Sequence, residues 1–205
     1  MDKDRILELL SDEARRRRCH PLRVFVSSTF KDLKKERQAV KNALSMCGCV
    51  PVLAENAPMQ PGKGLMGQIQ FWLSDIDLLV LLVCERYGET SPSKSSWTKL
   101  EVEEAMKMGK PVFSYFVKGR IPAGMEWNEQ KRKRLEDFKS WLNRLPDQQP
   151  PQHTKNLQEL VIRVSRDVGA LQSDYRAEAM IDIILREVDR ERDEGNESYY
   201  RGFLG

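Results

Sequence analysis

The sequence feature that most constrains the fold is an unbroken apolar run at Leu78–Val83, with the sequence LLVLLV. The run is far shorter than the roughly 20 residues that cross a bilayer, and it suits a central parallel strand that is covered on both faces. A predicted helix follows from about Thr98 and stops at Gly109-Lys110-Pro111, because glycine and proline end helices. Val112–Val117 then supplies a second buried strand. This stretch therefore predicts a parallel sheet between layers of helices.

The chain before this stretch has the same alternation of strands and helices. Arg23–Ser27 and Val50–Leu53 are predicted strands, while Asp32–Met46 and Leu65–Ser74 carry apolar residues at helical spacing. This order of elements implies right-handed crossovers between parallel strands. We therefore expect a three-layer α/β sandwich that has at least four parallel strands, with Leu78–Val83 inside the sheet.

The rest of the chain is predicted to be mainly helical. Residues 128–145 form a charged amphipathic helix, residues 146–153 a linker or a tight crossover, and residues 156–171 a further helix. A last helix at about 174–194 carries an apolar stripe made of Met180, Ile181, Ile184, Leu185 and Val188. The tail adds aromatic and aliphatic side chains, namely Tyr199, Tyr200, Phe203 and Leu204. The helix and tail either pack on the domain or contact a partner.

These elements predict three regions. Residues 1–21 form an N-terminal helix, residues 22–171 the α/β domain, and residues 172–205 a C-terminal helix and tail. The sequence begins MDKDR and lacks the apolar core of a secretory signal, so a cytoplasmic protein is expected. In a reducing compartment the four cysteines are expected to be free thiols: Cys19, Cys47, Cys49 and Cys84.

Composition and motif spacing argue against two classes of site. The net charge is only +3, which gives no strong field for nucleic acid. The basic runs at 15–18 and 131–134 are interpreted as solvated helix faces, with a phosphate- or nucleic-acid-binding patch as the alternative. No metal site is predicted, because the only two histidines are far apart and Cys47-x-Cys49 lacks the spacing of zinc ligands.

Polar residues follow two predicted strands at their carboxyl ends, where ligands bind in open α/β sheets. The first strand leads into Ser27-Ser28-Thr29-Phe30, and the central run leads into Arg86 and Tyr87. Hydroxyl groups at such a position hold a sugar or a phosphate, but they also cap helices, and both roles stay open. Arg86 either faces a phosphate or forms a salt bridge with Glu89 or Glu36.

Glu101 is the candidate catalytic residue, because it falls on the first turn of the helix that starts near Thr98. That position would bring its carboxylate beside the pocket at the strand ends. The structural alternative is that Thr98-x-x-Glu101 is a capping box, in which the carboxylate only satisfies the backbone at the helix start. The helix dipole also favours acidic residues there.

Three segments resemble a widespread family of uncharacterised domains with the signature VFVSSTF-x-DL-x-x-ER. They are VFVSSTFKDLKKER at 24–37, SDIDLLVLLVCERYGE at 74–89 and TKLEVEEAMKMGKPVF at 98–113. That family is related to TIR domains and to nucleoside 2-deoxyribosyltransferases. The resemblance covers roughly residues 22–117 and leaves both termini outside it. It implies a flavodoxin-like, TIR-like sandwich with added helices at both ends.

Two motifs of these relatives converge on Glu101. In enzymatic TIR domains the catalytic glutamate follows a tryptophan by four positions, and Trp97 precedes Glu101 by four. In deoxyribosyltransferases G-T-x-x-E leads into A-x-x-x-G-K-P-V, which is similar to Thr98, Glu101 and the AMKMGKPV run at 105–112. The chain departs from both patterns. Ser96 or Trp97 stands where the transferase glycine is expected, and Thr98 stands in place of the TIR cysteine.

The resemblance implies an N-ribosyl hydrolase or transferase that cleaves NAD or a related nucleotide, acting as a bacterial antiphage effector. Glu101 would stabilise the oxocarbenium-like state or attack as a nucleophile. No cofactor, no membrane contact and no nucleic-acid partner are expected. The expected protein partner is a second copy of the chain or a partner defence protein, which would bind through the C-terminal helix and tail. The alternative is a non-catalytic TIR-like interaction or signalling module. The expected substrate-binding residues are Ser27, Ser28, Thr29, Phe30, Arg86, Tyr87, Trp97 and Thr98.

Overall fold

The computed structural model describes residues 21–29, 32–92, 95–118, 129–146 and 148–203 of the chain. Residues 21–168 form one compact unit, and the chain from Gly169 onward belongs to a second unit. The N-terminal helix predicted before residue 21 lies outside the described residues.

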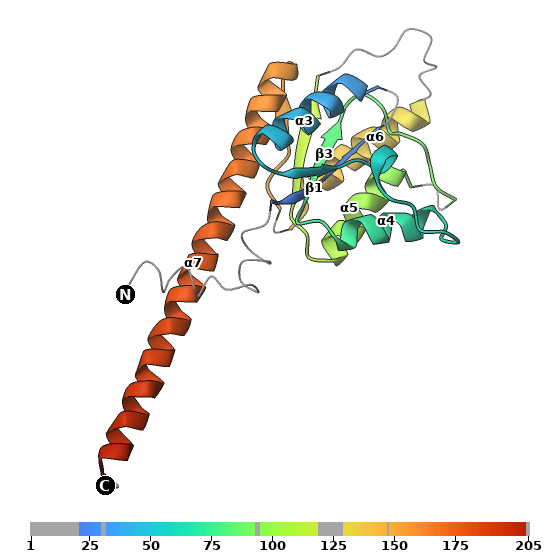
Figure 1. Cartoon of the computed structure of the whole chain (residues 1–205). Helices are drawn as coiled ribbons and strands as arrows, with labels where there is room; N and C mark the ends of the chain where they lie inside the picture. The colour runs from blue at the N-terminus through green and yellow to red at the C-terminus, as the bar shows by residue number, and fades with distance from the viewer. Residues whose placement is uncertain (1–20, 30–31, 93–94, 119–128, 147, 204–205) are drawn as a thin grey trace. The chain divides into compact units, whose positions relative to one another are not determined.

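The sheet has five parallel strands in the order β2-β1-β3-β4-β5 (Figure 1). This is the strand order of flavodoxin-like folds. The strands are β1 (Arg23–Ser28), β2 (Val50–Val52), β3 (Leu78–Val83), β4 (Val112–Val117) and β5 (Gln152–Thr154). The predicted α/β class, the parallel sheet and the internal place of Leu78–Val83 are therefore confirmed.

Helices cover both faces of the sheet, which makes the three layers (Figure 1). The helices are α3 (Lys34–Met46), α4 (Leu65–Ser74), α5 (Trp97–Lys107), α6 (Glu129–Leu142) and α7 (Leu157–Phe203), with a short 3-10 helix η1 at Ala54–Asn56. One face of the sheet packs against α4, α5 and α6 in a single apolar cluster. The other face packs against α3 and against the beginning of α7, where Tyr115 of β4 donates a hydrogen bond to Asp167 (2.8 Å).

The register of the strands sets the position of the functional residues. In β3 every side chain is buried, because neighbouring strands and both helical layers enclose it. Ser27 and Ser28 of β1 pair with Leu81 and Leu82 of β3, so β1 and β3 end at the same edge of the sheet. The loops that follow these two strands therefore meet above that edge.

Two predictions about the C-terminal part of the chain were wrong. The segment expected as a linker contains β5, a short polar strand held through Gln152, which donates a hydrogen bond to Asp167 (2.6 Å). The two helices expected at 156–171 and 174–194 are one continuous helix, α7. No proline or left-handed glycine interrupts it in the described residues, and Ser173 bonds the carbonyl of Gly169 one turn earlier (3.0 Å).

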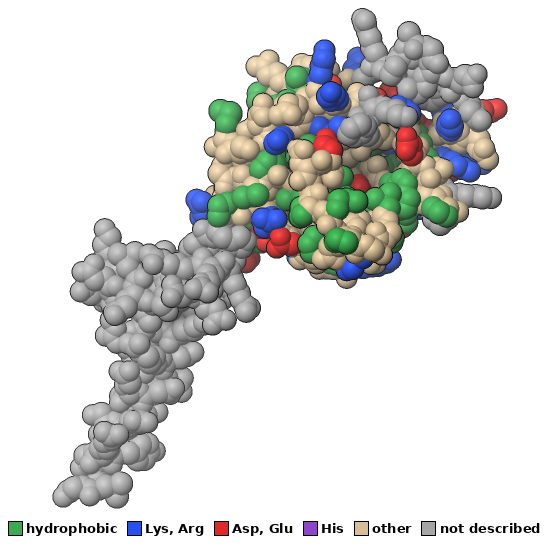
Figure 2. Space-filling view, turned by 45° about the vertical axis from the view of Figure 1, so that its right-hand side comes forward, with side chains coloured by type: hydrophobic (Ala, Val, Ile, Leu, Met, Phe, Trp, Pro, Cys, Tyr) green, Lys and Arg blue, Asp and Glu red, His purple; other side chains and the backbone are tan. Residues whose placement is uncertain are grey.

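The face of the described chain in Figure 2 is mixed in charge. Lys and Arg side chains are spread among Asp and Glu side chains on the face that Figure 2 shows. Among the described helices, none has the length and continuous apolar character that a bilayer crossing requires. Among the described cysteines, Cys47 and Cys84 are free thiols, as predicted.

Candidate functional site

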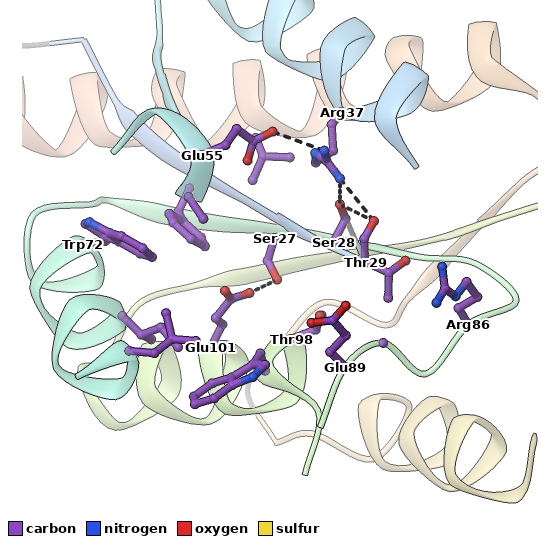
Figure 3. A pocket seen from close by; sticks show the side chains of 17 residues that line it. Ser27, Ser28, Thr29, Arg37, Glu55, Trp72, Arg86, Glu89, Thr98 and Glu101 are labelled. Atoms are coloured by element: carbon purple, nitrogen blue, oxygen red, sulfur yellow. Dashed lines mark hydrogen bonds and ion pairs between the residues drawn. The ribbon is translucent and has the colours of Figure 1, made fainter. Parts of the chain in front are cut away.

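A cavity of about 210 Å³ opens at the carboxyl ends of β1 and β3 (Figure 3). Its walls come from β1 and the residues after it, from η1 and α4, from the loop after β3, and from the start of α5. One end is apolar, with Trp72 beside it, and Arg86 and Glu89 lie at the other end (Figure 3). Glu101 lies between these two ends, so its carboxylate is available to a ligand that spans them.

Glu101 is held by β1 across the cavity. The Ser27 hydroxyl donates a hydrogen bond to Glu101 Oε2 at 2.5 Å. The cap of α5 is a different residue, because Ser96 Oγ accepts the backbone N–H of Lys99 (3.1 Å). Glu101 is therefore not the side chain that caps the helix, and its carboxylate is turned toward the strand and the cavity.

The surroundings of Glu101 favour a bound proton. Burial among Phe25, Ile69 and neighbouring apolar groups raises the pKa of Glu101 from its ordinary value near 4.5 to about 7, while the hydrogen bond from Ser27 opposes part of that rise. A carboxyl with a pKa near neutrality can exchange protons with a ligand at physiological pH. The same group ionises readily when a positive charge approaches it.

Arg37 is a functional candidate that the sequence reading missed. It lies on the buried stripe of α3 between Leu33 and Val40, and only 4% of its surface is exposed. Its Nη1 donates hydrogen bonds to Ser28 Oγ and to the carbonyl of Thr29, both at 3.2 Å. A charged residue in the middle of an apolar helical stripe was the signal that could have identified it.

The loop after β3 closes one side of the cavity through a glycine. Gly88 has a φ of +86°, which favours glycine, and a Cβ atom there would lie 3.0 Å from the Thr29 methyl group. The loop then folds back on itself, with a bridge between Thr90 and Ser96. Any side chain at position 88 would push this loop or Thr29 out of place.

The opposite wall is the loop between β2 and α4, which α4 holds folded. The Gln68 side chain accepts the backbone N–H of Gln60 (2.8 Å) and donates to the carbonyls of Gln60 (2.5 Å) and Lys63 (3.1 Å). Trp72 Nε1 donates to the carbonyl of Pro58 (2.8 Å). These bonds fix the part of the loop that follows Glu55, so the wall exists before any ligand binds.

The structure gathers most of the residues predicted to form the site. Those that line the cavity are Ser27, Ser28, Thr29, Arg86, Trp97, Thr98 and Glu101. Tyr87 is not among the lining residues. Its ring packs edge-on against Phe138 of α6, and its hydroxyl accepts the backbone N–H of Ser96 (3.3 Å). Phe30 lies outside the described residues.

Asp77 lies away from the cavity, at the opposite ends of β1 and β3, where it accepts a hydrogen bond from the backbone N–H of Arg23 (2.8 Å). In the described part of the chain, no group of three or more His, Cys, Asp and Glu side chains is arranged to hold a metal ion.

Comparison with known families gives one match, which covers residues 23–169 and is described as a domain of unknown function, DUF4062. The chain belongs to the DUF4062 family. The match includes all five strands and the whole cavity, so the site described above lies within the DUF4062 domain. A comparison with curated proteins found no match.

Solved structures with a similar fold are distant from this DUF4062 protein. One is the flavodiiron protein from Giardia intestinalis, with a TM-score of 0.42, 14% identity, and coverage of 77% of this chain and 37% of the other. Another is the TIR domains of the activated Roq1 resistosome that directly recognises the pathogen effector XopQ. Its TM-score is 0.40 and its identity 14%, with coverage of 82% of this chain and 99% of the other. The chain thus spans little more than a third of the flavodiiron protein.

The raised pKa of Glu101 predicts a specific dependence of stability on pH. The folded protein holds this proton more tightly than the unfolded chain, so the contribution to stability is complete below about pH 4.5 and is lost as the pH rises to about 7. Glu101→Gln removes the ionisation and keeps an acceptor for Ser27. We expect the variant to match the wild type near pH 5 and to exceed it by about 2 kcal/mol in free energy of unfolding at pH 8.

Urea denaturation at both pH values measures this difference. Glu103→Gln is the matched control, because Glu103 is on the same helix but forms a surface salt bridge with Lys99 (3.4 Å). If the stability of the wild type and of Glu101→Gln changes equally with pH, burial does not raise the free energy of the ionised Glu101 carboxylate, and the prediction is wrong.

Proposed function

We propose that this protein is an N-ribosyl hydrolase or transferase that acts on NAD or a related nucleotide, with Glu101 as its catalytic carboxylate. The observation that carries the proposal is the Glu101 carboxylate, which lies between the apolar end and the charged end of a strand-end cavity, is held by Ser27 and does not cap its helix. The similarity of the Trp97–Glu101 and Thr98–Glu101 spacings to TIR enzymes and deoxyribosyltransferases supports the same residue.

The chemistry requires little more than one well-placed carboxylate. Cleavage of a ribosyl C–N bond develops positive charge on the ribose carbon and its ring oxygen. When the leaving base departs from a cationic nucleotide such as NAD, it leaves as a neutral molecule and needs no general acid. Glu101 then stabilises the cationic ribose electrostatically or attacks its carbon, and water or another acceptor completes the reaction.

The environment of Glu101 suits a cationic substrate. In the free protein burial raises the pKa of Glu101 to about 7, so the group carries a proton part of the time at neutral pH. A positive charge beside the carboxylate lowers that pKa and drives ionisation. The cationic substrate would therefore generate the anion that its own transition state requires, while Ser27 holds one carboxylate oxygen in position.

Replacement of Glu101 tests the activity directly. Purified full-length protein is incubated with NAD, NADP and a panel of nucleosides and nucleotides, and release of the free base is followed by liquid chromatography. We expect Glu101→Gln to lose activity by a factor on the order of 10³, because the stabilising charge is gone. Ser27→Ala is expected to lose roughly tenfold or more, because the carboxylate is no longer held.

Glu103→Gln serves as the control for charge on the same helix and is expected to keep full activity. If Glu101→Gln releases base as fast as the wild type, Glu101 is not catalytic. If no substrate is consumed, and cells that express the two proteins have identical metabolite profiles, the interaction module becomes the better account. An antiphage role, which we propose by analogy with TIR-like effectors, requires that the Gln variant also lose protection in infected cells.

We also propose that activity depends on assembly through the C-terminal part of α7 and the tail. In the described part of that segment Ile181 and Leu185, one helical turn apart, are 55% and 56% exposed. Two large apolar side chains on one exposed face are typical anchors for another chain.

Charged substitutions on this face test the assembly. Ile181→Lys together with Leu185→Lys is expected to lower the mass of the full-length protein in light scattering, since buried lysines would oppose the contact. Ile162→Lys is the control, because Ile162 is also on α7 and is 57% exposed. A wild-type protein that is monomeric at every concentration, with and without nucleotide, would contradict the proposal.

A further inference from the structure

We infer that the carboxyl end of β1 holds an anion-binding position centred on Arg37, which Glu55 fills in the free protein and which the phosphate of a nucleotide takes over. Only the identity of the anion rests on the proposed function. The position itself rests on the contacts, burial and charges of Arg37, Glu55, Ser28 and Thr29 (Figure 3).

Arg37 is buried and anchored in a way that fixes the direction of its guanidinium group. The side chain is 5% exposed and borders the cavity, and its Nη1 is bound to Ser28 Oγ and to the Thr29 carbonyl. A guanidinium group that is removed from water in this way needs an anionic partner, and its fork suits carboxylates and phosphates. The site is therefore built for an oxyanion.

Glu55 supplies that oxyanion from a movable position. Its Oε1 lies 3.2 Å from Arg37 Nη2, and its side chain is 35% exposed. It comes from η1, in the wall of the same cavity, and is not part of the sheet. The carboxylate of Glu55 can turn into solvent without breaking the core, whereas Arg37 cannot. In the free protein the Glu55 carboxylate therefore occupies the position that the anionic group of a ligand would take.

Thr29 offers a second polar group at the same place. Its Oγ1 is buried and has no hydrogen-bond partner among the described residues, although Thr29 lines the cavity. The Thr29 methyl group packs toward Gly88, which fixes the orientation of the side chain. A buried hydroxyl without a partner is costly, and a bound phosphate oxygen would accept its hydrogen bond.

The other charges of the cavity also fit this assignment. Glu101 is bound to Ser27 toward the apolar side, and Arg86 and Glu89 lie at the far end (Figure 3). Among the lining residues the carboxylate that contacts Arg37 is that of Glu55. A nucleotide whose phosphate binds Arg37 would have its ribose near Glu101. Because the phosphate replaces the Glu55 carboxylate, and Glu55 belongs to η1, substrate binding would release the contact between Arg37 and the wall that η1 forms.

Binding in the absence of catalysis tests the inference. All proteins carry Glu101→Gln, so that no ligand is consumed, and AMP is compared with adenosine by calorimetry because the two differ only in the phosphate. Glu55→Gln is expected to raise the affinity for AMP about three- to tenfold, because the competing carboxylate is removed, and to change the affinity for adenosine less than about twofold. Arg37→Gln, once shown to be folded, is expected to abolish the preference for AMP.

Glu89→Gln is the matched control, because it removes the same charge from the same cavity at a distance from Arg37. The inference is overturned if Glu89→Gln and Glu55→Gln strengthen AMP binding equally, or if adenosine gains as much as AMP. The side-chain NMR signal of Arg37 gives a second measurement. If neither AMP nor inorganic phosphate shifts it in the Glu55→Gln protein, the position binds no anion. Anion binding at Arg37 without base release by the wild type would contradict the proposed function and leave this inference intact.

Discussion

The structure depends on the burial of β3 on both faces. All six side chains of Leu78–Val83 are enclosed, so the strand must have a neighbour on each edge and a helical layer above and below it. Parallel neighbours and right-handed crossovers then bring the carboxyl ends of the central strands to one edge. The cavity is a consequence of this arrangement, because the chain continues from β1 to α3 on one face of the sheet and from β3 to α5 on the other face.

At that edge the fold holds two ionisable groups of opposite sign, the half-buried Glu101 and the buried Arg37, and each has a partner. Glu101 takes a hydrogen bond from Ser27, and Arg37 binds Ser28, Thr29 and Glu55. Three of these four partners, Ser27, Ser28 and Thr29, lie at the end of β1, so this strand end organises the acidic and the basic side of the cavity together. A nucleotide with a cationic base beside Glu101 and an anionic phosphate beside Arg37 would match this division of charge.

Local signals in the sequence were sufficient to predict most of the strands and helices of the fold. Apolar runs and helix-ending residues predicted β3, β4 and α4 with the bounds that the structure has. The strand β5 could not be predicted, because its three residues are polar and carry no apolar strand pattern. It forms through its pairing with β4, which is more than 30 residues earlier in the chain. The site was partly accessible in the same way. The place of Glu101 beside the cavity could be predicted from its position near the start of the helix after β3. The orientation of Tyr87 could not, because it depends on a ring contact with Phe138 of α6, which is distant in the sequence.

The measurement that tests the account most directly is the ionisation of the Glu101 carboxyl group, followed by carbon-13 NMR in the intact protein with and without a bound cationic nucleotide. The account predicts a pKa of about 7 in the free protein, caused by burial, and a fall in that pKa when the positively charged base of the nucleotide binds beside Glu101. A pKa near 4.5 that does not change when the ligand binds would contradict the account. Burial would then not disfavour the ionised form of Glu101, and the carboxylate would not be in contact with the reacting group.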